Sequence, residues 1–438
     1  MILRRIVDVR PDETRATLLA CGYFFFALGG WFVLRPVRDE MGVAGGVSGL
    51  AWLFTATMLV TLAANPLYAW LAARLPARRL VTVAYRAIMA LVVGFYTLFH
   101  AWPEHDVGLG RAFFVASSVF NLFITAIFWS LMADRFGPEQ GRRLFPFIGV
   151  GGTAGAITGS AIAAALAEPV GRLALLIGAV ALLEAAVQCA RRVPGAGRVE
   201  PGARAAAERP VGGAAWTSVT HVVRSPYLLG ICGFMLLFTV GSTWLYFQQA
   251  DLLGREMQDR AARTAFLARL DLAVQSITVC FQILLTARLL RAIGVAATLG
   301  VLPAASAAGF AALGAVPVLP VLAVFSVARR ALNFGLANPT REVLFTVLPR
   351  EDKYKAKAFI DTFVYRGGDQ VGAWSYAALR AGGATGSAIA WAAVPVSLVW
   401  LALAIWLGRR QARLERRGAT PPGVPDDEAE TAQPPRRP

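Results

Sequence analysis

Charged residues stand at the end of the first long apolar stretch of this sequence. Arg35, Arg38 and Asp39 are three and four residues apart, so they share one face if a helix continues past Pro36. Within a bilayer, an ionised side chain costs about 2.5–3.5 kcal/mol at the centre of a helix and therefore needs a partner or a watery cavity. Two guanidinium groups on one face could bind a carboxylate or a phosphate. The alternative is an Arg–Asp pair that only closes the outer rim.

A second charged group falls inside a later apolar stretch. Arg366 and Asp369 could pair at a spacing of three residues, and Asp361 lies a turn or more away. Three ionisable groups in one span are hard to place against lipid. We therefore expect them to line a cavity in which Arg366 contacts the substrate, with structural pairing between helices as the alternative. Either Asp39 or Asp369 could carry a coupling proton.

Neutral amides within the apolar stretches form a third group. They are Asn121, Gln248, Gln249, Gln275, Gln282 and Asn333. Such amides often only hydrogen-bond between helices, which contributes about 1 kcal/mol or less, and the sequence favours that interpretation for the group as a whole. Within it, Asn121 and Gln248 are predicted to contact the substrate.

No pattern typical of an enzyme accompanies these groups. His100, His105 and His221 have no nucleophile or metal ligand beside them in the sequence. The four cysteines lie in or at the ends of apolar stretches and show no C-x-x-C spacing. They are Cys21, Cys189, Cys232 and Cys280. We expect no enzymatic activity, no cofactor and no metal.

The glycine-rich run from Gly149 to Ser160 superficially resembles a phosphate-binding loop. No Gly-Lys-Ser/Thr sequence ends it, however. Small residues at four-residue spacing are what close packing of two helices requires. We therefore predict that this run packs a helix tightly against a neighbour.

The whole chain has the composition of an integral membrane protein. Its 438 residues are 56% hydrophobic and 16% charged, and the mean hydropathy is +0.55, which excludes a soluble domain of this size. A membrane span needs roughly 20 mostly apolar residues. The sequence supplies such stretches near Ala16–Leu34, Val47–Ala73, Leu80–Trp102, Arg111–Ala133, Pro146–Ala167, Val170–Ala190, Tyr227–Gln249, Thr264–Ala287, Ile293–Ala312, Val316–Ala337, Ala356–Ala378 and Ser387–Leu407. The predicted fold is all-α, with twelve transmembrane helices in two six-helix pseudo-repeats.

A segment rich in Arg, Ala, Gly and Pro separates two sets of six stretches. We predict an N-terminal six-helix bundle over residues 1–190, a cytoplasmic linker over 191–226, a C-terminal six-helix bundle over 227–408 and a disordered cytoplasmic tail over 409–438. A weak internal repeat supports the duplication. It aligns Glu139 with Glu351, Arg143 with Lys355, and Phe147-Ile148 with Phe359-Ile360.

The distribution of basic residues predicts the orientation. The formal net charge of +16 would suggest nucleic acid as a partner of a soluble protein, but here the basic residues lie mainly in loops between apolar stretches. Most of them fall in the loops that are cytoplasmic if both termini are inside. We therefore predict a monomer in the bacterial inner membrane with both termini in the cytoplasm. Its expected partners are the bilayer and a small solute, and not nucleic acid.

Several segments carry a family resemblance when they are taken together. They are Leu34–Asp39, Phe128–Asp134, Gly141–Phe145, Pro339–Phe345 and Lys353–Asp361. This combination resembles the ATP/ADP translocase family of bacteria and plastids, which lies within or close to the major facilitator superfamily. The resemblance implies twelve helices, alternating access and exchange of anionic nucleotides through a cationic cavity, with Arg38 as a substrate contact. The translocases have an acidic residue early in helix four and a lysine in helix eleven, where this sequence has Ser117 and Asp369.

These observations predict a secondary transporter of a small anionic solute, related to nucleotide exchange carriers. A strict ATP/ADP antiporter is the first alternative, and a non-transporting membrane receptor or scaffold is the second. We also expect a gate on the cytoplasmic side that opens and closes during transport. Its predicted residues are Asp134, Arg142, Arg143, Arg341, Glu342, Lys355 and Asp361.

Overall fold

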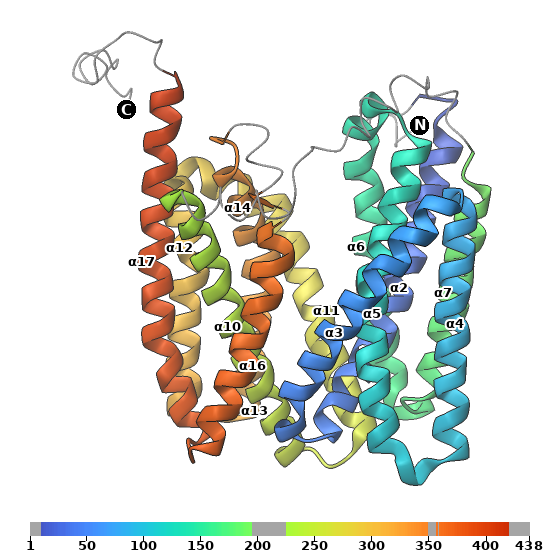
Figure 1. Ribbon diagram of the computed structural model, residues 1–438, viewed down its shortest axis with the longest axis horizontal. Coiled ribbons are helices and arrows are strands. Elements are labelled where there is room, and N and C mark those ends of the chain that lie inside the picture. The colour runs from blue at the N-terminus through green and yellow to red at the C-terminus, as the bar shows by residue number, and fades with distance from the viewer. Residues whose placement is uncertain (1–9, 195–224, 349–355, 358, 420–438) are drawn as a thin grey trace.

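In a computed structural model, the chain forms two helical bundles that stand side by side (Figure 1). The structure describes residues 10–194, 225–348, 356–357 and 359–419. The first bundle consists of α2 (Thr14–Ala44), α3 (Val47–Arg74), α4 (Ala77–Ala101), α5 (Asp106–Arg135), α6 (Pro138–Val170) and α7 (Ala174–Arg192), with a 3₁₀ turn, η1, at Pro103–His105. Short turns join these helices, so neighbours in sequence run in opposite directions.

The second bundle begins at Pro226, after the linker segment. It consists of α10 (Pro226–Glu256), α11 (Arg260–Cys280), η2 (Phe281–Leu285), α12 (Thr286–Ala315), α13 (Leu319–Leu332), η3 (Asn333–Ala337), α14 (Asn338–Leu344), η4 (Ile360–Val364), α16 (Tyr365–Ala381) and α17 (Gly386–Ala419). The elements η2, η3 and η4 are π-helical turns. Each one continues directly into a flanking α-helix, so α13, η3 and α14 form one bent span, and η4 and α16 form another.

The described residues account for all twelve predicted spans. Ten helical runs are long and apolar enough to cross a membrane, and one of them, Arg260–Ala315, holds two spans. The division falls at Gly294, whose φ of 74° breaks the helix in a conformation that favours glycine. The η4–α16 span is not among the ten, because Asp361, Arg366 and Asp369 lower its hydropathy. The twelve-helix prediction is confirmed.

Two helix ends differ from their predicted positions. Helix α2 continues through Pro36 to Ala44, so Arg35, Arg38 and Asp39 lie on one helix. Helix α17 continues to Ala419, past residue 408, where the prediction placed the start of a disordered tail. The apolar signal ends there, but the Arg-rich sequence that follows has good intrinsic helix propensity. The rest of the tail and most of the linker lie outside the described residues.

The glycine-rich run forms the face of α6 that packs against α2. A Cβ atom added to Gly151 would lie 2.6 Å from the carbonyl oxygen of Cys21, and one added to Gly155 would overlap the carbonyl of Phe25. The two backbones therefore approach more closely than any side chain allows. The predicted helix-packing role of this run is confirmed, and α2 is thereby fixed in the centre of the first bundle.

The bundles meet on one side of the molecule and diverge on the other (Figure 1). Helix α11 contacts α2 and α6, and α16 contacts α3. We call the side where the bundles meet the far side; α2 ends there and α5 and α11 begin there (Figure 1). Contacts among Glu40, Asp106, Arg172 and Arg260 define it. The opposite side, where α2 begins and α17 ends, is the terminal side. The two bundles are thus joined at the far side and stand apart at the terminal side (Figure 1).

Candidate functional site

A cavity of about 390 Å³ lies between the bundles and is lined by both of them. Residues from α2, α3 and α5 face residues from α10, α13, η3 and α16. A second cavity of about 720 Å³ adjoins it toward the terminal side. The two cavities share the lining residues Met58, Phe238, Asn333, Phe334, Tyr365 and Arg366. A solute of moderate size could therefore pass from the terminal side to the centre of the molecule.

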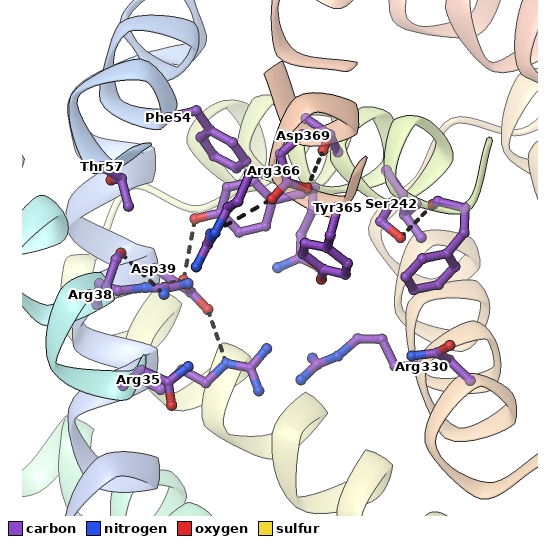
Figure 2. Close-up of a pocket in the computed structure, with 18 of the residues that line it drawn as sticks. Arg35, Arg38, Asp39, Phe54, Thr57, Ser242, Arg330, Tyr365, Arg366 and Asp369 are labelled. Atoms are coloured by element: carbon purple, nitrogen blue, oxygen red, sulfur yellow. Dashed lines mark hydrogen bonds and ion pairs between the residues drawn. The ribbon is translucent and has the colours of Figure 1, made fainter. Parts of the chain in front are cut away.

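The first bundle contributes the charged group on α2 that the sequence singled out. Figure 2 shows Arg35, Arg38 and Asp39 together on one wall of the cavity. Arg38 Nε donates to Asp39 Oδ1 at 2.9 Å, and Arg35 Nε lies 3.8 Å from Asp39 Oδ2. The guanidinium of Arg38 also stacks over the ring of Phe114 at 5.0 Å. The spacing of three and four residues thus brings all three groups to the cavity, because α2 stays helical beyond Pro36.

The second bundle places two adjacent arginines opposite this group. Arg330 Nη2 donates to Asp271 Oδ1 at 2.6 Å, and Arg330 faces Arg35 across the cavity (Figure 2). Arg35 Nη1 lies 3.6 Å from the same Asp271 oxygen. Asp271 therefore joins an arginine of one bundle to an arginine of the other.

Arg329 is buried, with an exposed fraction of 3%, and has only neutral partners. It donates to Ser242 Oγ at 2.8 Å, to Ser306 Oγ at 3.1 Å and to the carbonyl oxygen of Phe238 at 3.1 Å. Within the described part of the chain it has no carboxylate partner. A buried cation without a counter-ion is costly, so this arginine is positioned to attract an anion from the cavity.

Helix α16 contributes the last charged pair. Arg366 Nη1 lies 3.8 Å from Asp369 Oδ2, and Thr243 Oγ1 donates to Asp369 Oδ1 at 3.5 Å. The predicted i, i+3 pairing is therefore present, and both side chains line the cavity (Figure 2). Distances this long leave the guanidinium free to turn toward another acceptor.

The lining of the cavity is positively charged overall. Among the described residues, five arginines, Arg35, Arg38, Arg329, Arg330 and Arg366, face it together with two carboxylates, those of Asp39 and Asp369. Charges of one sign in a cleft with low-dielectric walls concentrate the field there. The cavity is therefore suited to an anion and unfavourable for a cation.

Aromatic rings from both bundles form the floor of the cavity toward the far side. Phe54 of α3 contacts Tyr246 and Phe247 of α10, with ring centroids 5.7 and 5.4 Å apart. The hydroxyl of Tyr246 donates to Asp39 Oδ1 at 3.2 Å, which ties α10 to α2. Rings of Phe238, Phe334 and Tyr365 line the opposite end of the cavity. This lining supplies flat apolar faces beside the arginines.

The structure separates the two amides that were predicted to contact the substrate. Asn121 lines the cavity. Gln248 does not; it points between α10 and the start of α17, where its Nε2 lies 3.5 Å from the carbonyl oxygen of Gly386. Its neighbour Gln249 lines the cavity instead. The sequence could not separate the two, because adjacent residues on a helix point about 100° apart and the apolar pattern of α10 does not reveal which face is inward.

The described residues of the predicted gate lie on the terminal side, which is open (Figure 1). Three ion pairs that these residues form each stay within one bundle: Arg143 with Glu13 at 2.8 Å, Arg341 with Asp361 at 3.5 Å, and Lys357 with Glu342 at 2.6 Å. Asp134 is exposed. Lys355 and the side chain of Arg142 lie outside the described residues. A gate formed by these residues in another conformation stays a prediction.

An ion-pair network that the sequence did not reveal closes the far side. The buried carboxylate of Glu40 accepts from Arg260 Nε at 2.6 Å, and Arg172 Nη1 lies 3.4 Å from it. Asp106 pairs with Arg172 at 2.7 Å and also with Arg260. Arg263 lies 3.8 Å from Glu40. Because Arg260 and Arg263 come from the second bundle and the other members from the first, this network holds the two bundles together.

Three site residues escaped sequence reasoning: Asp271, Arg329 and Arg330. The arginines occur as an isolated pair within an apolar stretch, Leu319 to Leu332, and Asp271 lies in the middle of α11. Ionisable residues in a span were a usable signal for all three. What the sequence lacked was any indication that α11 and α13 face α2.

Comparisons with known proteins agree with this architecture. The sequence model of the Major Facilitator Superfamily matches residues 16–368. No curated protein matches the chain in sequence. Similar solved structures include the nucleoside transporter NupG (16% identity, TM-score 0.59, covering 93% of this chain and 99% of that one). Another is a bacterial homolog of the human lysosomal transporter Spinster, inward-facing and unoccupied (13% identity, TM-score 0.61, covering 93% of this chain and 99% of that one). A third is a D-xylose–proton symporter (11% identity, TM-score 0.59, covering 95% of this chain and 98% of that one). At these identities the structural likeness shows the fold alone.

Proposed function

The chain belongs to the major facilitator superfamily, and from this premise we propose that it carries a small anionic solute across a membrane by alternating access. It is a multi-pass membrane transporter and not an enzyme. The observation that carries the proposal is the charge of the central cavity, where five arginines face two aspartates. A substrate with one or more carboxylate or phosphate groups would balance this excess and could accept paired hydrogen bonds from guanidinium groups.

The proposed mechanism is a rocking of the two bundles about the central cavity. The N-terminal bundle (1–190) and the C-terminal bundle (227–408) would move as units joined by the linker. Opening the far side requires the Glu40–Arg260 and Asp106–Arg260 pairs to separate. Closing the terminal side would bring the predicted gate residues of the two bundles together. With both termini in the cytoplasm of a bacterial cell, the present conformation would be inward-facing.

A nucleotide is the second candidate substrate. The aromatic rings of Phe54, Tyr246, Phe238 and Tyr365 stand beside the arginines, and a base could stack on such rings while its phosphates meet the guanidinium groups. The structural similarity to a nucleoside transporter and the sequence resemblance to ATP/ADP translocases are compatible with this candidate. Asp369, which stands where the translocases have a lysine, reduces the positive charge available to a polyanion.

Uptake into proteoliposomes tests both candidates. The purified transporter is reconstituted and offered labelled ATP, UMP, citrate, succinate, glutamate and inorganic phosphate, together with xylose as an uncharged control. We expect accumulation of at least one anion and none of xylose. Transport of xylose alone would refute an anionic substrate.

Two variants then locate the site. Arg38→Ala and Asp369→Asn should each change uptake of the anion by tenfold or more, about 1.4 kcal/mol. Arg86→Ala is the matched control, since Arg86 pairs with the exposed Glu184 within the first bundle, away from the cavity. If both cavity variants retained wild-type uptake, the assigned site would be wrong.

A further inference from the structure

Asp271 of α11 is almost completely buried behind the cavity wall, with an exposed fraction of 2%. Its Oδ1 atom contacts two guanidinium groups, Arg330 Nη2 at 2.6 Å and Arg35 Nη1 at 3.6 Å. Its Oδ2 atom is buried and has no hydrogen-bond partner. This carboxylate is therefore held through one oxygen, by a short hydrogen bond from Arg330 and by the nearby charge of Arg35, while its second oxygen takes no part.

The two arginines belong to opposite bundles, Arg35 to α2 and Arg330 to α13. Both reach the same oxygen atom, so two like charges lie close together in a largely buried place (Figure 2). Their repulsion acts across the interface on which the bundles must rock. Asp39 does not remove it, because Asp39 lies on α2 beside Arg35 and also pairs with Arg38. Asp271 is the carboxylate that contacts both arginines.

We propose that Asp271 is the internal counter-ion of the empty transporter, which stands in for the substrate anion between Arg35 and Arg330. This inference rests on the proposed function and names a coupling residue for it. When an anion enters the cavity from the terminal side, it approaches the two guanidinium groups and balances their positive charge in place of Asp271. When the anion leaves, Asp271 pairs with them again. The bundles can therefore change conformation in both the loaded and the empty state.

The proposal predicts what removal of the charge does. In Asp271→Asn the empty transporter has two unbalanced arginines across the interface, so its bundles separate on the far side. The loaded transporter keeps its balance, because the substrate supplies the negative charge. Exchange of internal for external anion should survive, whereas net uptake, which needs the empty transporter to return, should fall at least tenfold. A carboxylate needed only for folding would lose both activities together.

Distance measurements test, without any substrate, whether the bundles of Asp271→Asn separate on the far side. The four native cysteines are first replaced by alanine. Spin labels are then attached at Glu104→Cys and Glu256→Cys, one exposed position of each bundle on the far side. The distance between the labels reports how far apart the bundles stand there. In chloride buffer, the wild type should give one short distance. Asp271→Asn should increase the long-distance population several-fold. Asp251→Asn is the matched control, since Asp251 also contacts two arginines, Arg255 and Arg380, but all three belong to the second bundle.

A second substitution separates charge balance from folding. Asp271→Asn/Arg330→Gln removes one charge of each sign and should restore the short distance and the yield of folded protein. Identical distance distributions for wild type and Asp271→Asn overturn the proposal. So does a double variant that is as open or as unstable as the single one.

Inorganic phosphate distinguishes the counter-ion role of Asp271 from the proposed transport of an anionic solute. Replacing chloride by phosphate should return Asp271→Asn to the short distance, because the anion occupies the place of the missing carboxylate. Suppose that Asp271→Asn opens the far side and the double variant closes it, but that neither phosphate nor any anion of the uptake panel returns Asp271→Asn to the short distance. Asp271 then remains the ion that bridges the two arginines, and the anionic substrate is refuted. If an anion is transported and net uptake and exchange fall equally in Asp271→Asn, the substrate class stands and the coupling role is refuted.

Discussion

The guanidinium of Arg329 is surrounded by two serine hydroxyls, a backbone carbonyl and the rings of Phe238 and Trp400. We predict opposite effects on stability and transport when its charge is removed. Arg329→Met keeps the length of the side chain and relieves an uncompensated buried charge, so the thermal midpoint in detergent should stay the same or rise. Uptake of the anion should fall by roughly tenfold or more, since a close charge contributes several kcal/mol at an effective dielectric near 20. Unchanged uptake would assign Arg329 to structure alone.

Arg143 was predicted as a gate residue, but it hydrogen-bonds to the buried Glu13 just before α2. Burial favours a raised pKa for Glu13, but the hydrogen bonds from Arg143 and Gln140 outweigh it, so the pKa lies below its ordinary value. The stabilisation is therefore present at neutral pH and is lost as the pH falls through the acidic range in which glutamate titrates. We predict that Glu13→Gln lowers the thermal midpoint at pH 7. The difference from wild type should shrink toward pH 4, and a constant difference at all pH values would contradict it.

Single residues show where sequence reasoning stopped. The spacing of Arg35, Arg38 and Asp39, and that of Arg366 and Asp369, brings each group to one helix face, and all five line the cavity. The sequence does not fix the rotation of α10, so Gln248 and Gln249 could not be told apart. Asp271 needed knowledge of a contact between α11 and α2, which local spacing does not contain.

At the scale of elements, α6 depends on its glycines. We predict that Gly155→Leu separates α6 from α2, because the new side chain would occupy the position of the Phe25 backbone. The loss of stability should exceed about 3 kcal/mol, as for severe overpacking, and should appear as a lower thermal midpoint or loss of folded protein. Gly149→Leu is the matched control on the same helix, since nothing lies within 4 Å of a Cβ atom there. Equal tolerance of both changes would contradict the packing argument.

The helices were largely predictable because each span needs a long apolar stretch, and lipid enforces that requirement. The ends of helices in charged segments were harder to predict, because such a segment can form either a helix or a loop. Helix α2 continues past Leu34 because its charged residues find partners in the cavity. The π turns at η2, η3 and η4 leave no signal in hydropathy, although η3 places Asn333 and Phe334 on the cavity wall.

At the scale of the whole molecule, the network around Glu40 holds the far side closed. We predict that Arg260→Ala favours the conformation open on that side, because Glu40 and Asp106 lose their connection to the second bundle. The shift should be roughly tenfold or more, given the cost of breaking a buried ion pair. It can be measured as the rate at which a membrane-impermeant maleimide, added on the far side, labels Thr57→Cys in the cavity.

The control for this prediction is Arg255→Ala. Arg255 is exposed and pairs with Asp251 within the second bundle, so labelling should stay at the wild-type rate. Equal labelling of Arg260→Ala and wild type would show that the far side is held by the aromatic floor instead. The network escaped prediction because its members stand near the end of α2, in the turn after α6 and at the starts of α5 and α11, and only the assembled fold brings them together.

In the described part of the chain, the cations that line the cavity are all arginine. A guanidinium group keeps its proton at every pH that a cell encounters, whereas an ammonium or an imidazole can lose one when it is buried. The attraction of this cavity for anions is therefore permanent, and alkaline surroundings cannot switch it off. Any acid sensitivity of the carrier must arise elsewhere, in its few carboxylates or in the ionisation of the cargo itself.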